Sequence, residues 1–134
     1  MKSITIFCII IILISISDIK AQDEMQVKMG DTTITLKKYY FCLYKKGQKR
    51  DQDQTEADRI QTGHMSFISK NVQEGKICIA GPFEGEGDLR GILIFNVKSK
   101  EEAETALLDD PAIKSGRLIY EIIPWWSSKG AVLK

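Results

Sequence analysis

The sequence predicts an α+β domain in which two helices cover one face of a four-stranded antiparallel sheet. Short runs rich in aromatic and β-branched residues have the character of strands, and two longer stretches repeat apolar residues at helical spacing. These segments follow one another as strand, helix, strand, strand, helix, strand. Because strand–helix–strand crossovers are right-handed, this order predicts a ferredoxin-like βαββαβ sandwich.

The first half of this unit is predicted to be a strand, a helix and a second strand. Lys38 to Tyr44 is rich in aromatic residues, as expected of a strand. Thr55 to Asp58 has the pattern of a capping box and predicts the start of a helix, which Gly75 is expected to end. Lys76 to Ala80 predicts the second strand, with its end at Gly81-Pro82.

The second half is predicted to be a strand, a helix and a final strand. Gly91 to Val97 predicts the third strand, and Ser99 to Glu102 is a second capping box. The helix that it begins is expected to stop near Asp110, because a residue before proline is pushed out of the helical region. Arg117 to Ile123 predicts the last strand, closed by Pro124-Trp125-Trp126.

The first 21 residues predict a signal peptide. Met1 and Lys2 provide a positive start, an apolar run follows from Ile4 to Ile16, and Ala21 is a small residue suited to cleavage. The apolar run is shorter than the roughly 20 residues that a membrane-spanning helix needs. We expect an exported protein, periplasmic or extracellular, with no membrane contact after cleavage. An uncleaved anchor is the alternative.

Cleavage is expected to leave a short extension, one domain and a tail. The extension covers residues 22–37, and its residues 25–36 predict an extra strand or hairpin. The ferredoxin-like domain covers residues 38–126, and the tail covers residues 127–134. A chain of this length is long enough for one compact core and too short for two.

The charge balance argues against a nucleic-acid partner. The chain has 19 basic and 18 acidic residues, and cleavage removes Lys2, Lys20 and Asp18, which leaves no net charge. A nucleic-acid binder needs a basic surplus on one face. The basic run Lys45 to Arg50 is followed at once by Asp51 and is interpreted as a solvated loop.

No motif for a bound cofactor or metal is found. The sequence has no Walker-type loop, no Rossmann fingerprint and no Gly-x-Ser-x-Gly motif, and its one histidine and scattered carboxylates lack metal-ligand spacing. We therefore expect neither a cofactor nor a metal ion.

Two strands have apolar residues on both faces. In Tyr40 to Tyr44 and in Gly91 to Phe95, both alternating sets are largely apolar, although a sheet with helices on one face should have one wet face. A second copy of the chain is the simplest cover, so we expect a homodimer packed sheet to sheet. The contact residue is Tyr40 or Phe41, depending on the phase of the strand.

Cys42 and Cys78 are predicted not to form an intramolecular disulfide. They lie on the first and second strands, which the third strand separates in this topology. Two strand spacings place them about 9.6 Å apart, beyond the roughly 7 Å that a disulfide can bridge.

His64 is the only histidine and lies on the apolar stripe of the first helix, in line with Ile60, Phe67 and Val72. It is either a core histidine bonded to a neighbour or a general acid or base. Gly63 beside it indicates close approach of a loop or ligand, or plain tolerance of a helical glycine.

Asp110 is the expected partner of His64. The two helices run antiparallel, so His64 and the pair Asp109-Asp110 both come out about 15 Å from the same end of the sheet. Asp110 is expected to accept the ring N–H and leave the other nitrogen as the base. The alternative role for Asp110 is to cap the turn begun by Pro111, and both roles are compatible.

Gly81, Pro82 and Arg90 are the residues that we expect to bind a substrate at this same end. Gly81 lets a ligand approach the backbone, although a Gly-Pro step also simply ends a strand. Arg90 either binds an anionic substrate or pairs with Asp88.

Six short motifs follow one another along the chain: Gly63-His64-Met65, Glu74-Gly75-Lys76, Ala80-Gly81-Pro82-Phe83, Asp88-Leu89-Arg90-Gly91, Glu101-Glu102-Ala103-Glu104 and Asp109-Asp110-Pro111-Ala112. Together, in this order and spacing, they resemble the YCII-related domain of bacterial proteins, from Lys38 to about Trp126. The resemblance implies a dimeric, ferredoxin-like α/β barrel similar to small-molecule enzymes such as muconolactone isomerases and a dehydrochlorinase of a chlorinated hydroxyquinol. It also implies an active site made of His64 and Asp110. The signal segment and the extension through Leu36 depart from the usual pattern of the family.

Two function classes remain open from the sequence. The first is a cofactor-independent isomerase or lyase that acts on a small organic molecule with a His64–Asp110 pair, since both reactions need a base and no redox cofactor. The second is a non-catalytic module that binds a small ligand or only forms a dimer.

Overall fold

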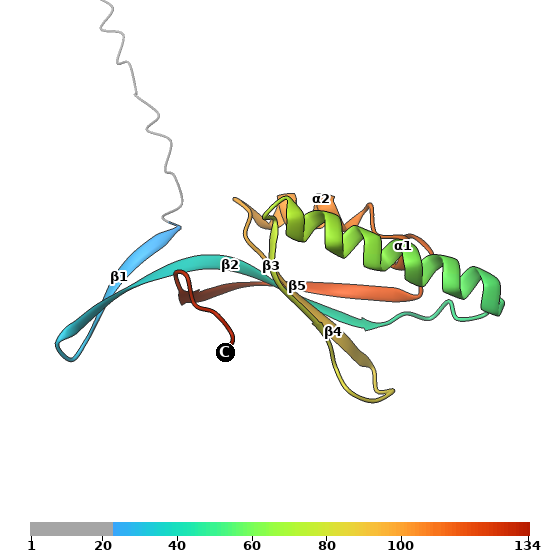
Figure 1. Cartoon of the computed structure of the whole chain (residues 1–134), viewed down its shortest axis with the longest axis horizontal. Coiled ribbons are helices and arrows are strands. Elements are labelled where there is room, and N and C mark those ends of the chain that lie inside the picture. The colour runs from blue at the N-terminus through green and yellow to red at the C-terminus, as the bar shows by residue number, and fades with distance from the viewer. Residues whose placement is uncertain (1–22) are drawn as a thin grey trace, which may run out of the picture.

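The computed structural model describes residues 23–134 (Figure 1). Its elements are β1 (Glu24–Met29), β2 (Thr32–Lys46), α1 (Gln54–Gln73), β3 (Ile77–Pro82), β4 (Leu89–Phe95), α2 (Lys100–Leu107), α3 (Pro111–Lys114) and β5 (Leu118–Ser128). The predicted signal peptide, residues 1–21, lies outside the described residues. None of the helices within residues 23–134 is long and apolar enough to cross a membrane.

The strands form one antiparallel sheet with the order β3-β4-β2-β5. Helices α1 and α2 lie over one face of it, and the other face carries no helix (Figure 1). This is the predicted ferredoxin-like βαββαβ sandwich, so the fold class is confirmed. It matters for function because the helix-covered face holds every residue of the candidate site.

The extension before the domain forms a hairpin. β1 pairs with residues 32–37 of β2, and the two strands are joined by the loop Gly30-Asp31. Gly30 has a φ of +60°, which a hairpin loop of two residues requires at its first position. Strand β2 therefore begins six residues before the predicted Lys38. Residues 24–37 project as an arm beyond the helix-covered part of the sheet (Figure 1).

Helix α1 begins two residues earlier than the capping box at Thr55 predicts. The cap is Asp53, whose carboxylate accepts a hydrogen bond from the N–H of Glu56 at 2.8 Å. Asp53 and Glu56 thus have the three-residue spacing of a capping box, shifted from the predicted one. The end of the helix at Gly75, which has a φ of +71°, agrees with the prediction.

The second predicted capping box is confirmed. Ser99 Oγ accepts from the N–H of Glu102 at 3.1 Å, and the Glu102 carboxylate accepts from the N–H of Lys98 at 3.0 Å. The helix ends at Leu107, and a separate short helix, α3, starts at Pro111 with Asp110 as its cap. The Asp-Pro step therefore ends one helix and starts another, which places a carboxylate at the junction.

Two strands run further than predicted, and both contain a proline. β3 continues through Pro82 instead of ending at Ala80, and β5 continues through Pro124 to Ser128. Each is an edge strand of the described sheet, since β3 pairs with β4 and β5 with β2. A proline is tolerated on an edge because one side of the strand makes no ladder hydrogen bonds there.

The main core lies between the sheet and the helices. Its buried members alternate along β2 and β4, as expected for one face of each strand, and they meet apolar residues of α1 and α2. They include Tyr40, Cys42, Tyr44, Leu93, Phe95, Ile77, Ile122, Phe67, Ala103 and Leu107. Burial of such side chains contributes about 1.5–3 kcal/mol each, so this face supplies most of the stability of the domain.

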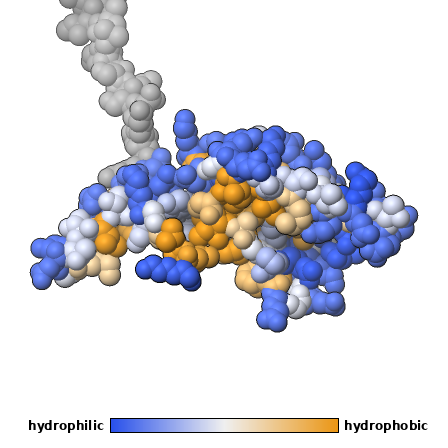
Figure 2. All heavy atoms as spheres, viewed as in Figure 1, coloured by the Kyte–Doolittle hydropathy of each residue, from blue (hydrophilic) through white to orange (hydrophobic). Residues whose placement is uncertain are grey.

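The opposite face of the sheet is also apolar, as the sequence predicts, and is covered by no element of the described chain. Phe41 and Leu43 of β2 point to it, because Tyr40, Cys42 and Tyr44 point to the helices. Trp125 packs edge-on against Phe41, with ring centroids 6.2 Å apart. We call this surface the open face. Figure 2 shows apolar residues (orange) gathered over the middle of the molecule below the helices.

The prediction for the cysteines is confirmed. Cys42 in β2 and Cys78 in β3 are both free, and strand β4 lies between their two strands. Cys42 is buried under the helices, whereas Cys78 is exposed.

Candidate functional site

The structure brings His64 and Asp110 into direct contact. His64 Nδ1 lies 3.0 Å from Asp110 Oδ1 and 2.9 Å from Oδ2. His64 reaches this position from the buried stripe of α1, and Asp110 reaches it from the junction between α2 and α3. Their side chains are almost fully enclosed, because His64 is 8% exposed and Asp110 is 0% exposed. The predicted contact between His64 and Asp110, which lie at the same height on the two helices, is therefore present.

Asp110 accepts hydrogen bonds from three different groups. Besides His64, the hydroxyl of Tyr44 donates to Oδ2 at 2.7 Å, and the N–H of Ala112 donates to Oδ1 at 2.9 Å. The last bond is the helix cap proposed as the alternative role, so one carboxylate performs both roles. A buried carboxylate is tolerated only with such partners, since an unpaired buried charge is strongly unfavourable.

Tyr44 is held as a permanent donor to this carboxylate. Burial raises the pKa of the Tyr44 hydroxyl well above its ordinary value, and the negative charge of Asp110 raises it further. The Tyr44 ring also packs edge-on against the His64 ring, with centroids 5.4 Å apart and planes at 70°. Tyr44 thus restrains both members of the pair.

These contacts determine which ring nitrogen of His64 is free. Because a carboxylate only accepts, Nδ1 carries a proton, and in the neutral imidazole Nε2 then keeps its lone pair. Nε2 makes no hydrogen bond within residues 23–134. Every buried side-chain nitrogen or oxygen among those residues has a hydrogen-bond partner, so Nε2 is not a buried atom. Nε2 is therefore accessible from the pocket that His64 lines.

Gly63 explains how the helix junction comes so close to α1. A Cβ atom at this position would lie 2.8 Å from Cγ of Pro111, which is too close for two carbon atoms. Glycine thus allows α3 to pack against α1 beside His64. Close approach of another segment, one of the two readings of this glycine, is confirmed.

A pocket of about 450 Å³ opens beside this pair, within the size range of small-molecule sites. The helix side of its lining comes from α1, including Ile60, His64 and Ile68, and the sheet side comes from β3 and β4. All three predicted binding residues line it: Gly81, Pro82 and Arg90.

The alternative reading of Arg90, an ion pair with Asp88, is wrong. Arg90 makes no ion pair within the described residues, and its Nη1 donates to the carbonyl of Gly87 at 3.4 Å. At Gly81, a Cβ atom would meet nothing within 4 Å. The fold itself thus does not require glycine at this position of the pocket wall.

Three further lining residues were not anticipated from the sequence: Tyr44, Arg50 and Arg117. The alternation along β2 contained a signal for Tyr44, since it shares a face with Tyr40 and Cys42. Arg50 is exposed, as the prediction of a solvated loop requires, and its loop also contacts the start of β5 through a hydrogen bond from Arg50 to the carbonyl of Arg117. No local pattern distinguished Arg117.

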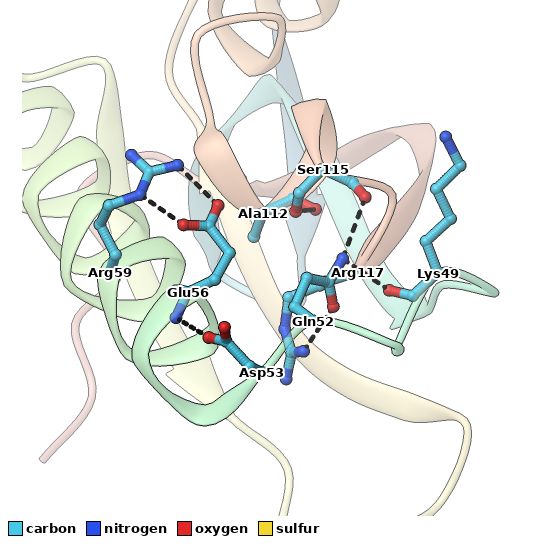
Figure 3. A network of polar contacts seen from close by, with 8 residues as sticks. All are labelled: Lys49, Gln52, Asp53, Glu56, Arg59, Ala112, Ser115 and Arg117. Carbon is cyan, nitrogen blue, oxygen red and sulfur yellow. Dashed lines mark hydrogen bonds and ion pairs between the residues drawn. The ribbon is translucent and has the colours of Figure 1, made fainter.

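A polar network holds the loop after β2 against the turn before β5 (Figure 3). Arg117 Nη1 donates to Gln52 Oε1 at 2.8 Å, and Gln52 Nε2 donates to the carbonyls of Lys49 at 3.2 Å and Ser115 at 3.5 Å. Arg50 Nη1 donates to the carbonyl of Arg117 at 3.1 Å. This network places Arg50 and Arg117 together at one end of the pocket.

Within the part of the chain that the structure describes, no group of three or more His, Cys, Asp or Glu side chains is arranged to hold a metal ion.

Comparison with solved structures finds a similar fold in a bacterial enzyme. It is 5-chloro-2-hydroxyhydroquinone dehydrochlorinase from Burkholderia phenoliruptrix AC1100, in complex with 2,5-dihydroxybenzoquinone. The two sequences are 24% identical, the match covers 64% of this chain and 92% of that chain, and the TM-score is 0.48. No curated protein sequence matches this chain.

The sequence also matches a family model. The match is to the YCII-related domain and covers residues 39–126, which is most of the chain and contains all six ordered motifs. It includes every residue that lines the pocket, together with His64 and Asp110. The chain therefore belongs to the YCII-related domain family.

Proposed function

We propose that this protein is an enzyme that transfers a proton on a small organic molecule, as an isomerase or a lyase, with His64 as the base. One observation carries the proposal: His64 Nε2 is open to the pocket, while Nδ1 is held by a fully buried carboxylate. A histidine that served only the core would have no need of a free nitrogen at a cavity wall.

The proposed reaction begins with removal of a proton from a carbon next to a carbonyl group. Nε2 takes the proton, and Asp110 stabilises the positively charged imidazole through Nδ1. The electron pair of the broken C–H bond forms a carbon–carbon double bond to the carbonyl carbon, and the π pair of the C=O bond moves to the oxygen, which gives an enolate. In an isomerase the carbonyl re-forms and a conjugated carbon takes the proton back from the imidazolium. In a lyase the carbonyl re-forms and the double bond shifts to the neighbouring carbon, whose leaving group departs with the electron pair of its own bond. Neither route transfers electrons to a redox cofactor.

The pocket walls suit such a step. Apolar side chains of Ile60, Ile68, Leu93 and Leu118 line the cavity around the base. Apolar walls exclude water from a small ring or chain and strengthen the electrostatic effect of the imidazole–carboxylate pair. The substrate class that we propose is a small, cyclic or carbonyl-bearing molecule.

The experiment has two stages. Thermal-shift screening against metabolite and aromatic libraries identifies ligands, and NMR in D₂O then follows exchange of their C–H protons in the presence of protein. We expect exchange with wild type, and a loss of about 100-fold or more with His64→Gln. The rate should also fall at acidic pH, because protonated Nε2 has no lone pair to accept a proton.

Ser66→Ala is the matched control, since Ser66 lies on the exposed side of the same helix and bonds the Thr62 carbonyl. It should exchange protons as fast as wild type. A ligand that binds saturably without any His64-dependent exchange would contradict the enzymatic proposal and favour the alternative, a non-catalytic binding module.

We also propose that a second copy of the chain covers the open face. Trp125, Ile123 and Ile119 of β5 expose 40%, 44% and 51% of their surface on this side of the sheet. The ion pair of Glu121 with Lys45 interrupts this surface between Ile119 and Ile123, and the apolar part continues over Ile123, Phe41 and Trp125. Exposed apolar surface of this kind is uncommon on a protein that stays monomeric. Phe41→Asp, which places a charge on this face, should dissociate the dimer.

Export of the protein is a separate proposal. It is supported by the positive start at Lys2 and the apolar run from Ile4 to Ile16. N-terminal sequencing of protein secreted from bacteria should find a chain that starts after Ala21. A chain that still begins at Met1 would contradict it.

A further inference from the structure

Three arginine side chains line the pocket: Arg50, Arg90 and Arg117. They come from separate segments, namely the loop after β2, strand β4 and the turn before β5. None of the three forms an ion pair with a carboxylate in the described chain.

The hydrogen bonds that these arginines do make are to neutral groups. Arg50 and Arg90 donate to backbone carbonyls, at 3.1 and 3.4 Å, and Arg117 donates to the side-chain amide oxygen of Gln52 at 2.8 Å. A guanidinium group carries five N–H donors, so most donors of each arginine remain available. Neutral partners orient the three groups and leave their charge uncompensated.

The three positive charges are close enough to affect one another. The pKa of Arg50 is lowered, first by partial burial and then by the positive charges of Arg117 and Arg90. Like charges gathered at a partly enclosed pocket destabilise the unliganded protein. A bound anion would remove this repulsion and occupy the free donors.

We propose that the pocket binds a small organic anion, with its carboxylate or similar oxyanion held by Arg50, Arg90 and Arg117. The planar guanidinium groups match the planar carboxylate, and their charge-assisted hydrogen bonds are stronger than neutral ones. The apolar part of the ligand lies along the wall that includes Leu93 and Ile68. The placement of the ligand's reacting carbon beside His64 rests on the proposed function, whereas the binding of an anion by the arginines does not.

The arginines also suit the proposed chemistry. Removal of a proton from the substrate carbon leaves an electron pair that spreads toward a conjugated carboxylate or carbonyl. Positive charge at that end of the pocket stabilises the negative charge as it develops. The same three residues would thus select the substrate and lower the barrier.

The first test compares anions with a neutral molecule of the same shape. Benzoate, phenyl phosphate and benzamide are titrated into the purified protein by calorimetry at low and high salt. We expect both anions to bind at least about tenfold more tightly than benzamide, with the difference shrinking at high salt. If benzamide binds as tightly as the anions, or if neither anion binds, the inference is wrong.

The second test removes one charge. Arg90→Gln should weaken benzoate binding about tenfold and leave benzamide binding unchanged. Arg59→Gln is the matched control, since Arg59 lies on the exposed side of α1, outside the pocket, and pairs with Glu56. Thermal melts confirm that both variants fold. Equal weakening by the two variants would show a general charge effect and overturn the site.

A third variant separates this inference from the proposed function. His64→Gln should slow proton exchange about 100-fold or more and change benzoate affinity by no more than about twofold. Arginine-dependent benzoate binding without any proton exchange would retain the anion site and reject the enzyme. His64-dependent exchange with no preference for anions would reject the anion site and retain the enzyme.

Discussion

The two faces of the sheet depart from ordinary packing in opposite ways. The helix-covered face buries polar groups, with Asp110 at 0% and His64 at 8% exposure, whereas the open face exposes large apolar groups such as Trp125 at 40%. Buried charges and exposed aromatic side chains are both uncommon in monomeric domains. The polar groups under the helices satisfy one another within one chain. The apolar groups of the open face find no cover within the described chain.

The contrast indicates a different function for each face of the sheet. A self-sufficient polar cluster beside a pocket is suited to chemistry or binding within one subunit. An uncovered apolar face is suited to association with another surface. Substitutions under the helices should therefore impair folding or chemistry, whereas substitutions on the open face should impair assembly.

The largest effect is expected for Asp110→Ala. The change leaves the donors of Tyr44, His64 and Ala112 unpaired and removes the cap of α3, which should lower the free energy of unfolding by about 3–5 kcal/mol. Urea denaturation measures it. Asp109→Ala is the control, because the neighbouring Asp109 is exposed and pairs weakly with Lys114 at 3.6 Å. Equal stability of the two variants would show that the polar cluster contributes nothing to folding.

The next effect concerns assembly and is expected for Phe41→Asp. Placing a charge on the open face should dissociate the proposed dimer without unfolding the chain, at a cost of about 3 kcal/mol of association energy. Light scattering at micromolar concentration measures the mass of each variant. Phe83→Asp, in the loop after β3, should remain dimeric. A wild-type monomer, or a dimer that survives Phe41→Asp, would contradict the role assigned to this face.

A smaller effect on folding is expected for His64→Ala. Asp110 keeps the donors of Tyr44 and Ala112 in this variant, so the cost should be about 1 kcal/mol. Ile60→Ala, one turn earlier on the same buried stripe, should cost about 2–5 kcal/mol. A loss for His64→Ala as large as that for Ile60→Ala would identify His64 as a structural core residue.

An effect that is absent at neutral pH is expected from the buried thiol at alkaline pH. Burial raises the pKa of Cys42 from 9.0 to about 12, so the unfolded chain ionises before the folded one. Stability is therefore full below about pH 9 and falls as the pH rises toward 12, by at most about 1.4 kcal/mol per pH unit for this group. Melting temperatures between about pH 8 and 11 measure the slope. Cys42→Ala should flatten it more than Cys78→Ala, and equal slopes would contradict the prediction.

Features set by local periodicity were predictable from the sequence. Apolar spacing, capping residues and Gly-Pro punctuation predict the order of six elements, and with it the ferredoxin-like class. The contact between His64 and Asp110 was also predictable, because the rise per residue and the antiparallel arrangement of the two helices place both residues at the same height above the sheet end. Boundaries were less accurate where strand pairing decided them: β2 extends before Lys38 because it pairs with β1 in a hairpin, and β5 continues through Pro124 because it pairs with the distant β2.

The residues that complete the site beside His64 and Asp110 are brought together by the tertiary structure. The phase of β2 turns Tyr44 toward Asp110 and Phe41 toward the open face, and the alternation of residues alone does not distinguish the two faces when both are apolar. Arg50 and Arg117 are distant in sequence, and they meet because Gln52 joins two loops. The elements were predictable because they depend on local geometry, and the pair of His64 with Asp110 was predictable because the fold class fixes how the two helices run past one another. The pocket and its three arginines depend on loop paths and long-range packing, which no local pattern encodes.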